Sequence, residues 1–119
     1  MQFEIKDVES MQTALAEFCR FLDECRVSQE RIFDSRLAAS ELIGNVLRHA
    51  GGIAWLMGEI KDGFVELRVR SERAFVPPAK SVCSPVHSEH GRGLYLIDSI
   101  CAQRSLGEDG AIIVRIEMD

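Results

Sequence analysis

The sequence lacks the features that would assign the protein to a membrane or to nucleic acid. It has no apolar run long enough to span a bilayer, and the first residues, Met1–Lys6, do not form a secretion signal. Positive charge is scarce, because 14 Lys and Arg stand against 19 Asp and Glu, a net charge of −5. A nucleic-acid-binding surface needs a basic stripe that neutralises phosphates. We therefore expect a cytoplasmic protein with no membrane partner and no nucleic-acid partner.

Cysteine is too sparse and too irregularly spaced to predict a disulfide framework. The four cysteines are Cys19, Cys25, Cys83 and Cys101. A chain of 119 residues can bury a core without cross-links, so free thiols are the expected state. A zinc ion bound by Cys83, His87 and His90 is the weaker interpretation, because this spacing offers no clear fourth ligand although Glu89 lies near.

Proline is also scarce, and all three prolines fall in one stretch, residues 72–90. This stretch has no periodic pattern, and an irregular segment of this length predicts a functional lid. Elsewhere the spacing of apolar residues alternates between helical and strand periods. The predicted elements are a strand at 3–5, helices at 8–25 and 28–49, a hairpin of strands 53–60 and 64–70, a helix at 93–101, and a hairpin of strands 103–107 and 111–117.

Strands grouped into hairpins, with helices between them, predict an α+β fold in a single domain, residues 1–119. The pairs Asp62-Gly63 and Asp109-Gly110 are typical of hairpin turns. Hairpin strands run antiparallel, so the sheet is expected to be mixed and mostly antiparallel, with helices on one face. The predicted architecture is a two-layer α/β sandwich.

The helix at 28–49 carries a carboxylate and a carboxamide, Glu41 and Asn45, spaced so that both project from one side. The predicted apolar face comprises Ala39, Leu42, Ile43, Val46, Leu47 and Ala50. The pair is expected opposite this face, with Arg48. One interpretation is an ordinary solvated surface. The other is chemical, because a Glu/Asn pair can hold Mg²⁺ and polarise a hydroxyl. Gly44 favours the second, since a glycine inside a helix costs ~1 kcal/mol and suggests the close approach of another group.

A second motif, Gly91–Ile97, indicates a glycine turn that opens a helix. The free N–H groups at a helix start can bind phosphates. Together with Glu41 and Asn45 this motif predicts a nucleotide site. Arg92 and Lys80 are each a candidate to contact a phosphate or an ordinary solvated cation.

The joint spacing of these motifs resembles the GHKL nucleotide-binding superfamily, and within it the anti-sigma-factor serine/threonine kinases of bacterial partner-switching systems. Glu41, Asn45 and His49 match the N-box of that superfamily, and Gly91–Ile97 matches its Gly-x-Gly box. Residues 63–70 match the strand that leads to the base-reading motif. The resemblance covers nearly the whole chain.

The resemblance implies a Bergerat-type ATP-binding fold with ATP and Mg²⁺ as cofactors. Asn45 would chelate the Mg²⁺, and Glu41 would be the catalytic residue that orients or deprotonates the attacking hydroxyl. The residues that would contact the nucleotide are Asn45, His49, Ser71, Gly91, Arg92, Gly93 and Leu94.

The base-reading motif departs from the family pattern. The family carries Asp-x-Gly-x-Gly, and this chain carries Ser71-Glu72-Arg73-Ala74-Phe75. Replacing the Asp by Ser71 removes a charge-assisted hydrogen bond to the adenine amine, which costs about 1.5–3 kcal/mol. Arg73 and Phe75 place side chains where the backbone must approach the nucleotide. Glu72 would replace the Asp only through a one-residue slip, which turns its side chain to the other face of the sheet.

Two functions follow from these observations. The first is an anti-sigma-factor-type kinase whose partners are a sigma factor and an anti-sigma-factor antagonist, the latter being the phosphorylated substrate. The second is a nucleotide-free or weakly binding pseudokinase that acts as a protein-interaction module. A detached catalytic domain of a histidine kinase is disfavoured, because no dimerisation helix with its own phosphoacceptor precedes Phe3. The resemblance also allows a homodimer.

Overall fold

Five strands form a single sheet in the order β1-β2-β3-β5-β4, and every pairing between them is antiparallel. The computed structural model describes residues 1–50, 52–72, 97–107 and 110–118, and only the backbone of residues 49 and 50. The elements are β1 (Gln2–Ile5), α1 (Val8–Glu24), α2 (Gln29–Asn45), η1 (Val46–Ala50), β2 (Ala54–Lys61), β3 (Phe64–Ser71), β4 (Gln103–Leu106) and β5 (Ile112–Glu117).

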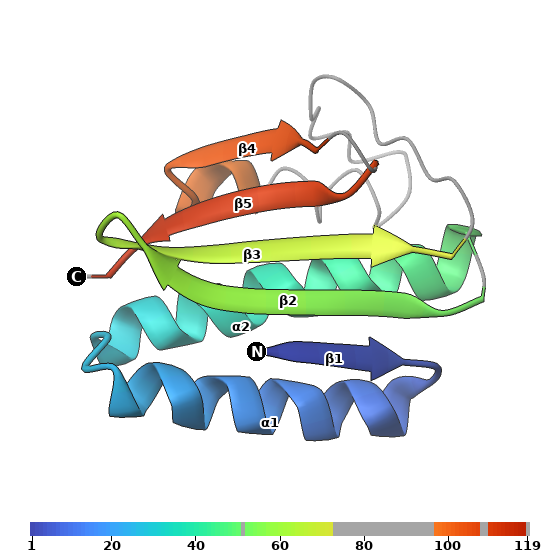
Figure 1. Cartoon of the computed structure of the whole chain (residues 1–119), viewed down its shortest axis with the longest axis horizontal. Coiled ribbons are helices and arrows are strands. Elements are labelled where there is room, and N and C mark those ends of the chain that lie inside the picture. Colours follow the sequence, from blue (N-terminus) through green and yellow to red (C-terminus); the bar gives the residue numbers. More distant parts are fainter. Residues whose placement is uncertain (51, 73–96, 108–109, 119) are drawn as a thin grey trace.

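The two long helices cover one face of this sheet (Figure 1). Helix α1 lies against β1 and α2, and α2 crosses β2, β3 and β5. The buried positions of α1 recur at helical spacing and include Leu15, Phe18 and Leu22, which agrees with the predicted amphipathic pattern. Facing strand positions such as Leu56 and Leu67 are fully buried beneath the helices. The core therefore lies in one layer between the sheet and the helix pair.

The first hairpin has the predicted two-residue turn. Lys61 pairs with Phe64, and between them Asp62 and Gly63 have φ values of 54° and 82°. Two successive residues at positive φ are what a type I′ turn requires, and Asp-Gly is a favoured sequence for it. The turn fixes the register of β2 and β3 along their whole length.

Side chains define where the two long helices begin. Asp7 caps α1, because its Oδ1 accepts a hydrogen bond from the Ser10 amide at 2.8 Å while the Ser10 hydroxyl accepts from the Asp7 amide at 3.1 Å. The hydrogen bond from the Ser10 backbone also lowers the pKa of the Asp7 carboxyl. Ser28 caps α2 by accepting from the Arg31 amide at 3.3 Å.

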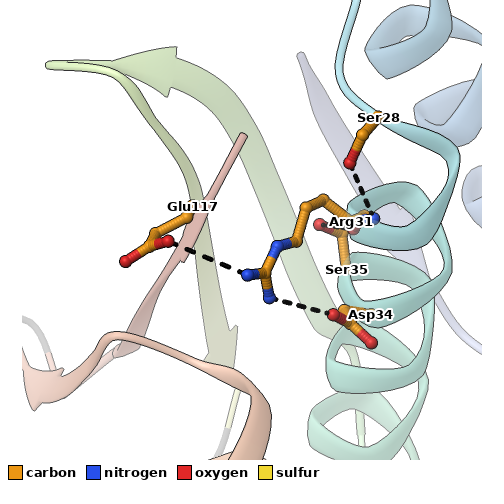
Figure 2. Close-up of polar contacts among 5 residues, drawn as sticks. All are labelled: Ser28, Arg31, Asp34, Ser35 and Glu117. Atoms are coloured by element: carbon orange, nitrogen blue, oxygen red, sulfur yellow. Dashed lines mark hydrogen bonds and ion pairs between the residues drawn. The ribbon is translucent and has the colours of Figure 1, made fainter. Parts of the chain in front are cut away.

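Arg31 connects the start of α2 to the end of the sheet (Figure 2). Its guanidinium lies 3.3 Å from the Asp34 carboxylate, one turn along the helix, and 3.8 Å from the Glu117 carboxylate at the end of β5. The buried Ser35 hydroxyl donates to the Arg31 carbonyl at 2.7 Å. This cluster joins the first turns of α2 to the end of β5.

Removing the Ser28 cap should lower the free energy of unfolding by about 1 kcal/mol, because one amide at the start of α2 loses its acceptor. We expect this result for Ser28→Ala in a urea titration. Thr13→Ala is the control, since the Thr13 hydroxyl bonds only to the Glu9 carbonyl inside α1. Equal stability of Ser28→Ala and Thr13→Ala would contradict the assigned cap.

The α+β two-layer fold with helices on one face is thus confirmed. Each strand pair among the described residues is antiparallel, in agreement with the mostly antiparallel sheet that the sequence predicts. Of the helix predicted at 93–101, residues 97–101 are described; residues 97–100 are helical and Cys101 is not. Residues 73–96, which include all of the predicted lid except Glu72, lie outside the described residues. In the described ranges, no helix combines the length and apolar character needed to cross a membrane.

Candidate functional site

The candidate site lies at the C-terminal end of α2, where the helix changes form. Regular α-helix ends at Asn45 and continues as the π-helical turn η1, Val46–Ala50. The predicted helix to about residue 49 is confirmed in extent. π-helical turns frequently mark functional sites, because the wider turn re-aims the side chains around it. In Figure 1 this end of α2 and the C-terminal end of β3 lie at the same end of the molecule.

Asn45 is buried, with 1% of its surface exposed, so its expected place on a solvated face is wrong. The physical reason is helical phase. Asn45 follows the fully buried Ala38 by seven residues, and at ~100° per residue two such positions lie almost above one another. Asn45 is therefore a flank of the apolar face, not its opposite.

The Asn45 amide is only partly satisfied. Its Oδ1 accepts a hydrogen bond from the Arg48 guanidinium at 2.8 Å. Its Nδ2 is buried and has no hydrogen-bond partner within the described part of the chain. Buried side-chain amides normally have hydrogen-bond partners. The unpartnered Nδ2 of Asn45 therefore points to a hydrogen-bond acceptor that the described residues do not supply. This is the observation on which the site depends.

Glu41 lies one turn before Asn45 on the same helix and is half-buried. Among the described residues, its carboxylate makes no hydrogen bond or ion pair. A carboxylate without a structural partner, beside a buried amide, is suited to accept a proton from a hydroxyl.

The side chain of Arg48 lies beside Gly44. A Cβ on Gly44 would lie 3.3 Å from Nη1 of Arg48, which folds back along the helix to reach Asn45. The prediction that another group approaches this glycine closely is thereby confirmed, and the group comes from the same helix. Arg48 itself is exposed as a residue, as the sequence predicted.

Ser71 ends β3 on the face that the helices cover. It pairs with the fully buried Ala54, and directly opposite residues of paired strands share a face. The amide of the next residue, Glu72, donates to the Ile53 carbonyl at 2.7 Å, so the ladder continues without a slip. Glu72 is exposed. The register therefore places Ser71, and not Glu72, on the face that the helices cover.

The remaining predicted site residues cannot be placed against this geometry. Gly91, Arg92, Gly93 and Leu94 lie outside the described residues, and so does the His49 side chain. The same holds for Arg73 and Phe75 and for the weaker zinc interpretation at Cys83, His87 and His90.

Other chemistry is not favoured in the part that the structure describes. Cys19, Cys25 and Cys101 are free thiols, as predicted. Burial raises the pKa of the Cys19 and Cys101 thiols, which disfavours the nucleophilic thiolate. No group of three or more His, Cys, Asp or Glu residues in the described ranges is placed to hold a metal ion.

The Asn45 site suits a metal ion that needs few protein ligands, and not one that needs a cluster of three or more. Mg²⁺ takes oxygen ligands and keeps several waters or phosphate oxygens, so one or two protein oxygens are sufficient. Asn45 Oδ1 is such an oxygen, and it already attracts a cation, the Arg48 guanidinium. The residues present therefore fit a magnesium–nucleotide site.

Sequence reasoning found Glu41 and Asn45 but missed the burial of Asn45 and its contact with Arg48. The seven-residue interval to Ala38 was the available signal for burial. No signal in the sequence predicts the Arg48 contact, because it depends on the rotamer of a long exposed side chain.

Comparison with known proteins identifies the family of the chain. The sequence model of the histidine kinase-like ATPase domain matches residues 6–116, which is nearly the whole chain. No curated protein matches the chain significantly. The matched region includes both long helices, the strands β2, β3 and β4, and β5 up to Ile116, whereas β1 lies before it. The chain belongs to the histidine kinase-like ATPase domain family.

Proposed function

We propose that this protein is an anti-sigma-factor-type serine/threonine kinase domain that binds Mg·ATP and regulates a sigma factor by partner switching. The observation that carries the proposal is the buried Asn45 amide with its unpartnered Nδ2, one turn after Glu41. Nδ2 is a donor that lacks an acceptor, such as a phosphate oxygen, and Oδ1 of the same amide supplies the oxygen that the family role of metal ligand needs. The sequence resemblance supports the finer assignment to the stand-alone kinases.

Asn45 Oδ1 would hold the Mg²⁺, which, when bound, neutralises charge on the transferred phosphate. Glu41 would accept the proton of a serine hydroxyl on the antagonist protein and orient its oxygen toward the γ-phosphate. Backbone amides at Gly91–Leu94 would hold the phosphates, with Arg92 as a further cation. Ser71 and His49 would line the nucleotide.

Catalysis in this scheme depends on position and charge more than on covalent chemistry, as in other phosphoryl-transfer enzymes. The described side chains support this division of roles. Asn45 is fixed by burial, whereas Glu41 keeps a carboxylate that no described neighbour binds.

Calorimetric titration with ATP and ADP, with and without Mg²⁺, tests the proposal. We expect micromolar binding that requires Mg²⁺. Asn45→Ala should weaken the binding of Mg·ATP about tenfold or more, because the ion loses its buried protein oxygen. Asn45→Ala that binds Mg·ATP as tightly as the parent would contradict the metal role.

A second function, a nucleotide-free interaction module, is favoured by one specific observation. Ser71, Arg73 and Phe75 stand where the family has an Asp and two glycines. The absence of binding at millimolar nucleotide would support this module and reject the kinase. The partner search would then use immobilised protein to capture the sigma factor and the antagonist, and a homodimer would be tested by sedimentation.

A further inference from the structure

Arg48 occupies the atom that the proposed metal would need. Its Nη2 lies 2.8 Å from Asn45 Oδ1, the one polar atom of that buried amide that has a partner in the described part of the chain. The absence of a side chain at Gly44 leaves space for the guanidinium, because a methyl group there would lie only 3.3 Å from Nη1 of Arg48. Gly44, Asn45 and Arg48 thus combine to place a cation, the Arg48 guanidinium, on Oδ1 of Asn45.

A divalent ion and this guanidinium cannot bind the oxygen together at low cost. Mg²⁺ lies about 2.1 Å from an oxygen ligand, and the guanidinium nitrogen now lies at hydrogen-bonding distance from the same atom. Two positive groups on the two lone pairs of one carbonyl oxygen would stand roughly 4 Å apart and repel each other. The ion therefore has to displace Arg48.

We propose that Arg48 competes with the divalent cation for Asn45 Oδ1 and thereby makes the site select the metal–nucleotide complex over the free metal ion. The inference rests on the proposed function. Free metal displaces the guanidinium and leaves it without a partner. Metal bound to a nucleotide arrives with phosphate oxygens, which pair well with a displaced guanidinium.

The competition requires that Arg48 can leave. Arg48 is exposed and makes no hydrogen bond or ion pair with any other side chain in the described part of the chain, so its release costs one hydrogen bond. Asn45 stays in place, because it is buried at the junction of α2 and η1. The switch is therefore confined to one long side chain.

The test measures Mn²⁺ binding to the whole protein by electron paramagnetic resonance, first without nucleotide and then with ADP. Arg48→Met keeps the aliphatic stem and removes the cation. It should bind free Mn²⁺ about tenfold more tightly than the parent, the equivalent of one charge-assisted hydrogen bond. The preference for Mn·ADP over free Mn²⁺ should be smaller in Arg48→Met than in the parent by a similar factor.

Arg36→Met is the matched control, because Arg36 is exposed on the same helix and carries the same charge. It should leave the Mn²⁺ affinity within about twofold of the parent, since a distant surface charge is screened. Adding Asn45→Ala to Arg48→Met should abolish the gain, which would locate the gained ion at Oδ1. Free Mn²⁺ bound no more tightly by Arg48→Met than by Arg36→Met would overturn the proposal.

The outcomes separate this inference from the function on which it rests. Mn·ADP bound by the parent, with free Mn²⁺ affinity unchanged in Arg48→Met, would reject the competition and keep the nucleotide site. Neither Mn²⁺ nor Mn·ADP bound by any variant would reject both.

Discussion

Glu41→Gln should slow phosphoryl transfer to the antagonist protein by about 10²–10⁴-fold, the usual contribution of a positioned general base. Glutamine has the same size and keeps the half-buried position of Glu41 on α2, but it cannot accept a proton from the serine hydroxyl. The affinity for Mg·ATP should change little, because the proposed metal ligand is Asn45. The measurement is single-turnover transfer of labelled phosphate at saturating ATP.

Glu17→Gln is the control for that experiment, since Glu17 is exposed on α1 and its change alters the net charge equally. A rate lowered only in Glu41→Gln assigns the loss to the transition state and not to binding. A rate in Glu41→Gln equal to that of Glu17→Gln would remove Glu41 from the mechanism. A weaker affinity for ATP at an unchanged rate would instead make Glu41 a binding residue.

Much of the fold could be predicted from local patterns, because its elements are specified by short-range rules. The Asp62-Gly63 pair has the two positive φ values that its turn demands, and the alternating residues of β3 settle which face is covered. Ser28 begins α2 as its residue type predicts. The sheet order could not be predicted, since β5 inserts between β3 and β4 through pairings that are distant in the sequence.

The residues of the candidate site were predictable from the sequence, and their environment only in part, since the interval to Ala38 indicated the burial of Asn45 but not its extent. The four-residue spacing of Glu41 and Asn45 is a local signal, and the structure keeps the two on one side of α2. The burial of Asn45 depends on how far the covered stripe of α2 extends around the helix. The sheet beneath α2 sets how wide the covered stripe is. A prediction from the positions of the apolar residues alone therefore placed Asn45 on the solvated side, although it is buried.

The same limit applies to close approaches between layers, and Gly58 is the strongest case. Gly58 is buried in the middle of β2, opposite Leu67. A Cβ there would lie 2.3 Å from Cε1 of Phe18 and 2.8 Å from its Cδ1. Phe18 comes from α1, and its ring is fully buried and stacked near Phe21 at a centroid distance of 6.5 Å. Nothing in the sequence around Gly58 or Phe18 predicts that the two residues approach each other.

Gly58→Ala should therefore destabilise the fold by about 2 kcal/mol, within the usual range for an overpacked core. The strand itself would prefer alanine to glycine, so the loss has to come from the clash with Phe18. Gly44→Ala is the contrasting control, because its Cβ would meet only the flexible end of Arg48, and the helix would gain up to about 1 kcal/mol. Urea titrations of the parent, Gly58→Ala and Gly44→Ala measure both changes in the free energy of unfolding.

The clash also predicts a coupling that separates it from a general loss of stability. Phe18→Leu removes the ring atoms that lie nearest to Gly58 and leaves a smaller apolar group. Alone it should be destabilising, since it opens a gap in the core. Combined with Gly58→Ala it should cost at least 1 kcal/mol less than the sum of the two single changes, because the new methyl group fills part of that gap. Strict additivity would show that Gly58 is required for the backbone of β2 and not for the approach of α1, and the helix layer would then owe its distance from the sheet to other contacts.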